Sequence, residues 1–397
     1  MNLTKYQQEA ESKAKEWKSF ALFMKMGSGK TRVAVELVNQ TPDIDLLVYI
    51  APLRLIKPLD ESIKPISEEV AKWGGFKTAK EVIYIGVETI GQSDRQYLQL
   101  FAKVQTAWNP FIIVDESIKI KNLEAKRTQR VLELGKMVWN KLILNGQPLT
   151  RDLLDLYPQM MFLDPRILNM SLSQFKNTFC KYTRVTKNGY AKELITGYEN
   201  IDYLYSLIGQ YIYECDLDLS VKQIFETKRY KVDPEARAEY ERLKAKFLDD
   251  EMMQLKNNNI FLEMTMKMQH QYCITPEKFD LVDEWLKSHP EDKVIIYCKY
   301  IASREECAKR YPDAVVLNYK SGSHGYNLQD RPFTIFFDGT FDWGDVIQAQ
   351  HRNYRVGQEH DCKYLSLEGD VNLEELISRN NKKKEGMAKY FKIRANG

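Results

Sequence analysis

Short continuous runs of Val, Ile, Leu and Phe, separated by polar or amphipathic stretches, mark the first and the last third of the chain. A continuous apolar run bounded by polar residues is typical of a strand that is buried on both faces of a sheet. Strands of this kind occur mostly in parallel sheets, with helices on both faces. The predicted strands are 20–23, 46–50, 82–85, 111–114 and 141–144, followed by 294–298, 314–317 and 333–338.

Helical patterns alternate with these strands, which predicts an α/β fold with parallel sheets flanked by helices. A chain of 397 residues is too long for one ordinary hydrophobic core, so we expect two domains. The middle of the chain is rich in helical patterns from Asp233 to Gln271. We therefore predict a first α/β domain over 1–165, a helical extension and linker over 166–275, and a second α/β domain over 276–397.

The composition of the chain excludes several classes of protein but does not by itself indicate a function. The chain has 58 Lys and Arg against 55 Asp and Glu, a net charge of only +3, so any nucleic-acid surface must be a local patch. The 6 cysteines lie far apart without a C-x-x-C pair, which argues against a zinc site and favours reduced thiols in a cytosol. The amino terminus lacks an apolar signal segment, and no apolar run approaches the ~20 residues of a membrane span. We expect a soluble intracellular protein.

The stretch Met24–Thr31 carries the first chemical signal. A buried strand that ends in a glycine loop and continues as a helix directs backbone N–H groups and the positive helix end toward one point, where phosphate oxygens bind. Gly27 and Gly29 let the backbone wrap an anion. Lys30 would neutralise the β- and γ-phosphates, and the Thr31 hydroxyl would ligate Mg²⁺. The P-loop pattern begins with glycine where this chain has methionine, so an ordinary glycine turn is the alternative.

Two acids follow directly after the predicted strand 111–114. They therefore lie at the carboxyl end of a core strand, the edge at which open α/β sheets bind their ligands. Asp115 can hold Mg²⁺, and Glu116 can orient and deprotonate an attacking water. The alternative, a turn and helix cap at a strand exit, weakens because the glycine loop lies upstream in the same alternating pattern.

A third set of candidates stands near the end of the chain, in the stretch Gln348–Gln358. Arg352 and Arg355 are three positions apart, so on a helix they would project from one face toward a single anion. Two arginines at this spacing are otherwise simply solvated. In the middle segment, tyrosines interleaved with lysines and arginines between 166 and 228 indicate either a nucleic-acid path or an ordinary helical extension.

Taken in order, these motifs resemble the superfamily 2 helicases of the Swi/Snf type. The most specific elements are the ending Q-x-x-x-R-x-x-R-x-G-Q and D-E-S-x-x-I-K-N after a buried strand. The chain departs from the family pattern at Met24, Ile118, Asn145 and Gln147. The motifs that carry the resemblance are Gln7, Gly29-Lys30-Thr31, Ala51-Pro52, Asp115–Asn122, Leu144–Pro148, Gly325–Gln329 and Gln348–Gln358.

The resemblance implies two tandem RecA-like domains, with ATP and Mg²⁺ in the cleft between them and double-stranded DNA across both. It also implies that Arg355 is the arginine finger on the γ-phosphate and that Arg352 is its phosphate-binding neighbour. With Lys30 and Glu116, these form the expected catalytic set. The expected nucleotide-binding residues are Gln7, Gly27, Ser28, Gly29, Lys30, Thr31 and Gln348, and the expected Mg²⁺ ligands are Thr31 and Asp115.

Compact members of this family are often encoded by bacteriophages, so the resemblance indicates a phage or bacterial protein in the cytoplasm of a bacterial host. The expected function is ATP-dependent translocation on duplex or branched DNA during replication, recombination or repair. We expect a monomer without membrane contact, with replication or recombination proteins as partners. Two alternatives stay open: an RNA helicase, which usually carries D-E-A-D and S-A-T, and a DNA-binding assembly subunit without ATP turnover.

Overall fold

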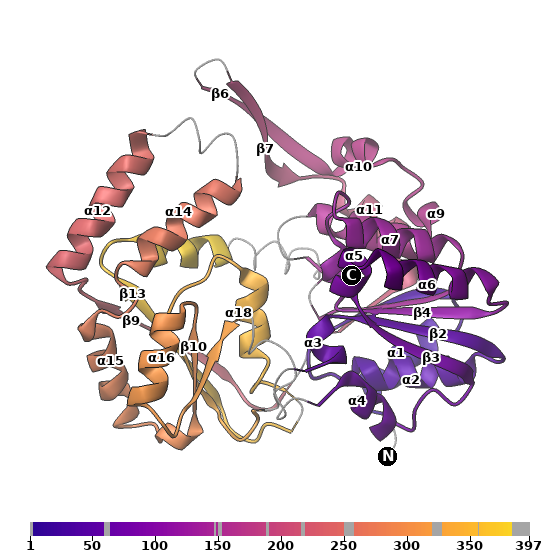
Figure 1. Ribbon diagram of the computed structural model, residues 1–397, viewed down its shortest axis with the longest axis horizontal. Helices are drawn as coiled ribbons and strands as arrows, with labels where there is room; N and C mark the ends of the chain where they lie inside the picture. Colours follow the sequence, from indigo (N-terminus) through magenta and orange to yellow (C-terminus); the bar gives the residue numbers. More distant parts are fainter. Residues whose placement is uncertain are drawn as a thin grey trace.

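The protein consists of two lobes, each built around its own parallel sheet (Figure 1). We call the lobe that contains the amino terminus the first lobe and the other the second lobe. In Figure 1 the first lobe is drawn in indigo to magenta and the second in orange to yellow. The computed structural model describes residues 3–58, 64–146, 148–149, 153–187, 190–215, 219–249, 258–319, 328–355 and 357–382.

The first lobe contains a six-stranded sheet in the order β3-β2-β4-β5-β1-β8, as far as the described residues show. All its neighbouring strands are parallel. Their carboxyl ends therefore share one edge, where the register places Asp115 beside Leu144 and Leu144 beside Leu22. The strands are β1 Ser19–Met24, β2 Ile44–Ala51, β3 Ala79–Gly86, β4 Pro110–Asp115, β5 Asn140–Leu144 and β8 Ile212–Cys215.

Helices cover both faces of this sheet. The helices α1, α2 and α4 pack on one face, and α5 to α11 provide the apolar side chains on the other. They are α1 Lys5–Ala14, α2 Lys30–Gln40, α3 Leu53–Ile56, α4 Ile66–Lys72, α5 Val87–Gln92, α6 Asp94–Thr106, α7 Lys126–Lys136, α8 Leu156–Leu163, α9 Pro165–Leu168, α10 Leu172–Phe179 and α11 Ile201–Ile208. The 3₁₀ turns are η1 Ser117–Ile120, η2 Leu153–Asp155 and η3 Gly209–Tyr211.

The second lobe contains a sheet in the order β11-β10-β12-β13-β9, again with parallel neighbours. The helices α12, α14, α15 and α16 cover one face, and α18 packs on the other. Residues 373–382 are also helical. The elements are β9 Gln223–Tyr230, α12 Pro234–Asp249, α14 Asn258–His270, α15 Pro276–Leu286, η4 Glu291–Lys293, β10 Val294–Cys298, α16 Ile301–Arg310, β11 Val315–Asn318, β12 Phe333–Phe336, α18 Trp343–Gln350 and β13 Cys362–Gly369.

The segment 166–275 differs from the predicted helical extension. It contributes β8 to the first sheet and β9 to the second, and it forms the antiparallel hairpin of β6 (Cys180–Lys187) and β7 (Tyr190–Tyr198), which projects from the lobes in Figure 1. The edge strands β8 and β9 carry no long apolar run, so the sequence pattern did not predict them. β9 reads Gln-Ile-Phe-Glu-Thr-Lys-Arg-Tyr, with most of its residues exposed or half-buried.

The predicted α/β fold with parallel sheets flanked by helices is confirmed. Every strand that the apolar runs predicted is present, with ends that differ by a few residues. All six cysteines are buried free thiols, in agreement with the absence of a disulfide pattern. Among the described helices, none combines the length and the apolar character that crossing a bilayer requires.

Candidate active site between the two lobes

The loop between β1 and α2 has the geometry of a phosphate cradle. Gly27 and Gly29 have φ angles of 81° and 86°, a left-handed conformation that side-chain-bearing residues rarely adopt. The helix α2 begins at Lys30, so the N–H groups of its first turn open toward the loop. Thr31 is buried in the same turn. The structure therefore assembles the predicted loop residues around one point, with the positive end of an eleven-residue helix behind them.

Gln7, predicted to bind the nucleotide, contacts the backbone of this loop. Its side chain is buried, and Nε2 donates a hydrogen bond of 2.9 Å to the Ser28 carbonyl oxygen. A Cβ atom on Gly29 would lie only 2.3 Å from that Nε2 atom, so a larger residue there would displace the Gln7 amide. The Ser28 hydroxyl donates to the Lys25 carbonyl oxygen at 2.7 Å, which closes the loop on itself.

The two acids lie at the carboxyl end of β4, on the edge that faces the loop. Asp115 is buried; its Oδ1 accepts the Glu116 backbone N–H at 2.9 Å, and its Oδ2 accepts the Tyr49 hydroxyl at 2.9 Å. Burial and the nearby Glu116 charge raise the pKa of Asp115 to about 7, while Lys30 opposes this rise. Glu116 has a φ of 50°, an uncommon conformation for a residue with a side chain, and is also buried.

A buried hydrogen-bond network connects the strand exits of β4 and β5 with α8. The Ser117 hydroxyl donates to Oε1 of Gln159 at 2.7 Å, and Nδ2 of Asn145 donates to the Ser117 oxygen at 3.3 Å. Nε2 of Gln159 donates to the backbone oxygens of Pro148 at 2.9 Å and Asp155 at 2.7 Å. The network positions the turn that carries Glu116, because Ser117 follows it directly.

Sequence reasoning missed Tyr49 and Gln159. Tyr49 lies within the apolar run of β2, and its hydroxyl meets Asp115 only because β2 and β4 are neighbours in the sheet. Gln159 could have been recognised from the sequence, because it is a polar residue in a largely apolar helix. The sequence of α8 is Leu-Tyr-Pro-Gln-Met-Met-Phe-Leu. A buried amide in such a helix needs hydrogen-bond partners.

Arg352 and Arg355 do not share a helix, so the prediction of one helical face is wrong. The helix α18 ends at Gln350, and both arginines lie in the turns that follow. Asn353 explains the break. Its buried side chain donates to the Arg331 oxygen and the Thr334 hydroxyl at 3.1 Å each and accepts the Tyr364 hydroxyl at 3.0 Å. These bonds tie the chain to the second sheet and turn it away from the helix axis.

The turn nevertheless brings both arginines to the first lobe. A Cβ atom on Gly27 would lie 2.6 Å from the Cβ atom of Arg355. Arg352 is buried, which lowers the pKa of its guanidinium to about 10, with a further lowering by Arg355 and opposing effects of Tyr297 and Glu116. Arg355 therefore packs on the phosphate loop, and Arg352 lies within electrostatic reach of Glu116.

The residues present fit ATP and Mg²⁺. Gly27 and Gly29 hold the left-handed backbone that lets successive loop N–H groups turn toward one anion, and side chains of Arg355 and Gln7 pack closely against them. The hydroxyl of Thr31 and the carboxylate of Asp115 are hard oxygen ligands of the kind that Mg²⁺ prefers, and such sites are completed by phosphate oxygens and waters. The described residues hold no cluster of three or more His, Cys, Asp or Glu side chains suited to a metal.

The remaining predicted positions lie in α18, beside the loop, or outside the described residues. Gln348 lies in the last turn of α18, half-buried, before the turns that carry the arginines. The glycine at position 146 approaches the loop, because a Cβ atom there would lie 3.0 Å from Cγ of Met26 and 3.7 Å from Nζ of Lys30. Gln147 and most of Gly325–Gln329 lie outside the described residues.

A family model described as SNF2-related domain matches residues 62–273, which is more than half of the chain. The chain belongs to this family. The match confirms the family-level resemblance that the sequence motifs indicated.

Proteins similar to this SNF2-related chain include large eukaryotic helicases. The probable ATP-dependent DNA helicase CHR23 of Arabidopsis thaliana is 24% identical over 351 residues, which cover 70% of this chain and 31% of that protein. The ATP-dependent helicase brm of Drosophila melanogaster is 23% identical over 352 residues, which cover 70% of this chain and 21% of that protein. The chain spans less than a third of the length of these curated relatives.

Among solved structures, the Sulfolobus solfataricus SWI2/SNF2 ATPase core in complex with dsDNA is similar to this SNF2-related chain. It has a TM-score of 0.44 and 20% sequence identity, and the likeness covers 100% of this chain and 94% of that chain.

Proposed function

We propose that this chain is an ATPase that hydrolyses ATP between its two lobes and uses the cycle to move along duplex DNA. One observation carries the proposal: residues suited to phosphate chemistry come from both lobes and meet at one loop. Lys30 and the acids of β4 lie on the first lobe, and Arg355 of the second lobe packs against Gly27 of the loop.

Each side chain has a distinct part in this scheme. Lys30 and the loop N–H groups bind the phosphates, and Thr31 and Asp115 hold the Mg²⁺ ion, which neutralises phosphate charge when bound. Glu116 orients the attacking water and accepts its proton. Arg355 reaches the γ-phosphate only when the lobes lie together, and its contact with Gly27 supports this, so hydrolysis depends on closure.

We extend the proposal to duplex or branched DNA as the polymer on which the chain moves. Family membership supports this extension, as do relatives whose names describe them as DNA helicases. Movement along DNA requires contacts that every sequence offers, so the contacts should go mainly to phosphates.

ATP hydrolysis tests the proposal directly. Lys30→Ala should abolish binding or turnover, whereas Glu116→Gln should bind ATP within a few fold but hydrolyse it about 10²- to 10⁴-fold more slowly, because the lost carboxylate acts only on the attacking water. Glu124→Gln, the same change at an exposed residue downstream, is the matched control. Parent-like turnover of Glu116→Gln would remove this residue from the role of base.

The same assay separates the alternatives by the polymer that stimulates it. Stimulation by duplex DNA supports the proposed function, and stimulation by RNA alone would indicate an RNA helicase. DNA binding without any turnover would indicate an assembly subunit. Measured binding to duplex DNA should also weaken with salt, with a log-log slope near about −0.9 for each phosphate neutralised. A strong preference for one duplex over a scrambled one at equal salt would contradict phosphate-based binding.

A further inference from the structure

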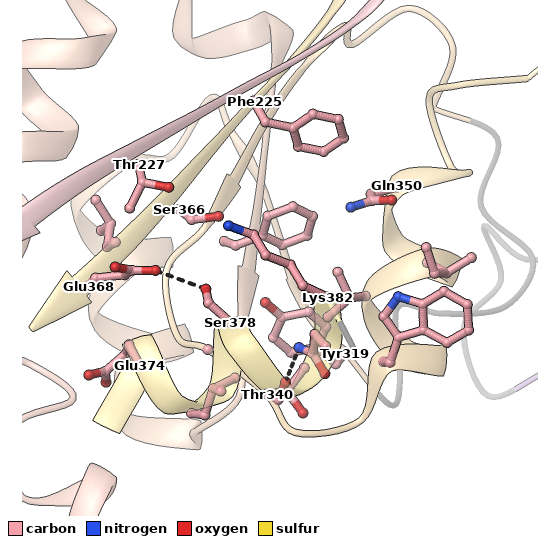
Figure 2. Close-up of a pocket in the computed structure, with 18 of the residues that line it drawn as sticks. Phe225, Thr227, Tyr319, Thr340, Gln350, Ser366, Glu368, Glu374, Ser378 and Lys382 are labelled. Carbon is pink, nitrogen blue, oxygen red and sulfur yellow. Dashed lines mark hydrogen bonds between the residues drawn. The ribbon is translucent and has the colours of Figure 1, made fainter. Parts of the chain in front are cut away.

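A cavity of about 850 Å³ lies in the second lobe, against the face of the sheet that α18 covers (Figure 2). The strands β9 and β13 form one wall, α18 forms another, and the helical residues 373–382 close the lower side. Lys25, the first residue of the phosphate loop of the first lobe, completes the lining. The volume is in the range of about 300–1,000 Å³ that small-molecule sites have.

An exposed aromatic ring forms the upper part of this cavity. Phe225 is 59% exposed, although its ring stacks on Tyr364 with centroids 4.9 Å apart and an angle of 16°. Tyr364 in turn stacks on Phe336 at 6.0 Å and 7°. The parallel register places Phe225 directly beside Tyr364, so the row is set by the sheet itself. The outermost ring is therefore rigidly backed and offers a flat surface to another planar ring.

Amide and hydroxyl groups surround this ring. Gln223 precedes it on β9, with Nε2 directed to the Tyr364 hydroxyl at 3.2 Å, and Gln350 faces the cavity from α18. Thr227 and Ser366 add hydroxyls on the two strands. An amide carries both hydrogen-bond donors and an acceptor, so it can pair with the donors and acceptors on the edge of a nucleobase.

Two ammonium groups and two carboxylates line the cavity. The Lys382 side chain extends into it from the helical residues 373–382 (Figure 2), and Lys25 approaches from the first lobe. The carboxylates already have partners: Glu368 of β13 accepts the Ser378 hydroxyl at 2.8 Å, and Glu374 accepts the Gln269 amide of α14 at 3.3 Å. Two ammonium groups beside an aromatic surface are suited to a phosphate attached to a base.

We propose that this cavity binds one nucleotide unit, with its base stacked on Phe225 and its phosphate at Lys25 and Lys382. A base within a duplex cannot reach such a site, because both of its faces are stacked on neighbouring base pairs. The unit must therefore be an unpaired nucleotide of a bound strand or a free nucleotide. Since Lys25 is contiguous with the phosphate loop, the occupant contacts both lobes and favours their closed arrangement.

Binding of a single-stranded oligonucleotide, measured with the candidate ATP site already occupied, tests this proposal. The candidate ATP site is first saturated with a non-hydrolysable ATP analogue, and a short labelled oligothymidylate is then titrated. Phe225→Ala should weaken binding about 5- to 100-fold, the loss expected for one base stacked on an aromatic ring. Phe225→Tyr keeps the ring and should bind like the parent. Ile224→Ala removes an exposed apolar side chain of the adjacent residue, which points to the other face of the sheet, and is the matched control.

A second probe distinguishes the two sources of the nucleotide. Displacement of the oligothymidylate by thymidine monophosphate, with the same Phe225 dependence, identifies a free nucleotide. Binding of the oligothymidylate alone identifies an unpaired strand. Photocrosslinking from a 5-iodouracil strand should map to Phe225 in either case. Equal binding by Phe225→Ala and Ile224→Ala, without a crosslink at Phe225, overturns the proposal. Phe225→Ala should keep duplex-stimulated ATP hydrolysis, so its outcome is independent of the proposed function.

Discussion

At the scale of single residues, two requirements act on the phosphate loop at once. Gly27 has a left-handed backbone, and the space beside its Cα atom is occupied by Arg355 of the other lobe. Gly75, in the turn after α4, has a similar φ of 71°, but nothing lies within 4 Å of the position of its missing Cβ atom. Comparing substitutions at Gly27 and Gly75 therefore distinguishes the effect of backbone strain, which both share, from the effect of the contact between the lobes, which only Gly27 has.

Gly27→Ala should therefore lower the rate of ATP hydrolysis by at least about tenfold, because the methyl group displaces Arg355 from the loop. Gly75→Ala should leave the rate unchanged. Both variants should lose about 1 kcal/mol of stability from the strained φ, measured by urea denaturation. Equal hydrolysis rates in the two variants would show that the contact between Gly27 and Arg355 has no part in turnover.

Sequence reasoning found the residues whose chemistry is tied to a local pattern. The loop glycines and the acids after β4 stand at strand exits, and an exit is readable from the apolar run before it. Tyr49 could not be found in this way, because its hydroxyl is functional only through the neighbouring strand β4. The turn at Arg352 was missed for a related reason: Asn353 breaks the helix through partners distant in sequence.

At the scale of elements, β5 carries an unusual buried cation. Lys141 is 6% exposed, and its Nζ donates to the Gly135 carbonyl oxygen at 3.0 Å and lies 5.8 Å from the Phe162 ring centre. Burial lowers its pKa from 10.5 to about 8, with Asp164 raising the pKa and Arg166 lowering it further. The charged form is thus disfavoured in the folded protein.

This shift predicts a stability that rises with pH. Between about pH 8 and 10.5 the unfolded chain keeps a proton that folded Lys141 has lost, so the free energy of unfolding should increase across this window. Lys141→Met should flatten the rise and should be more stable than the parent at pH 7, by up to about 3 kcal/mol less the lost hydrogen bond. Urea denaturation at several pH values measures the difference. Parallel pH profiles of parent and variant would contradict the assigned shift.

The network of α8 predicts a different effect on the same lobe. Gln159→Leu removes three buried hydrogen bonds, two of them to the backbone oxygens of Pro148 and Asp155. We expect a loss of about 2–4 kcal/mol in the free energy of unfolding. ATP hydrolysis should fall more than ATP affinity, because the network supports the turn that carries Glu116. Gln8→Leu, at an exposed position of α1, should change neither quantity.

Elements were predictable where burial on both faces leaves an apolar run. The strands β1, β2, β4, β5 and β10 are buried along nearly their whole length, and all were predicted. The edge strands β3 and β11 were predicted as well, but the edge strands β8 and β9 lack a long apolar run. β9 could be recognised only through its eight-residue register with β13, a pairing between segments more than a hundred residues apart. The prediction for 166–275 therefore included helices but not the strands β8 and β9.

At the scale of the whole molecule, the two-lobe architecture follows from chain length and from two series of strands. The contact between the lobes could not be predicted in this way, because no local sequence pattern encodes a contact between segments hundreds of residues apart. Arg355 and Gly27 are such a pair. In the proposed function, closure places a cation of the second lobe on the ATP phosphates held by the first, so the energy of ATP binding would draw the lobes together.

Arg355→Ala tests this coupling. The variant should bind ATP and duplex DNA within a few fold of the parent, because the loop and the DNA contacts are retained, but it should lose hydrolysis by about 10³-fold or more. It should also fail to displace a triplex-forming strand from a duplex, which reports translocation. Arg310→Ala removes an exposed arginine of α16 in the same lobe and should behave like the parent. If Arg355→Ala moves along duplex DNA at the parent rate, closure of the lobes does not couple hydrolysis to movement.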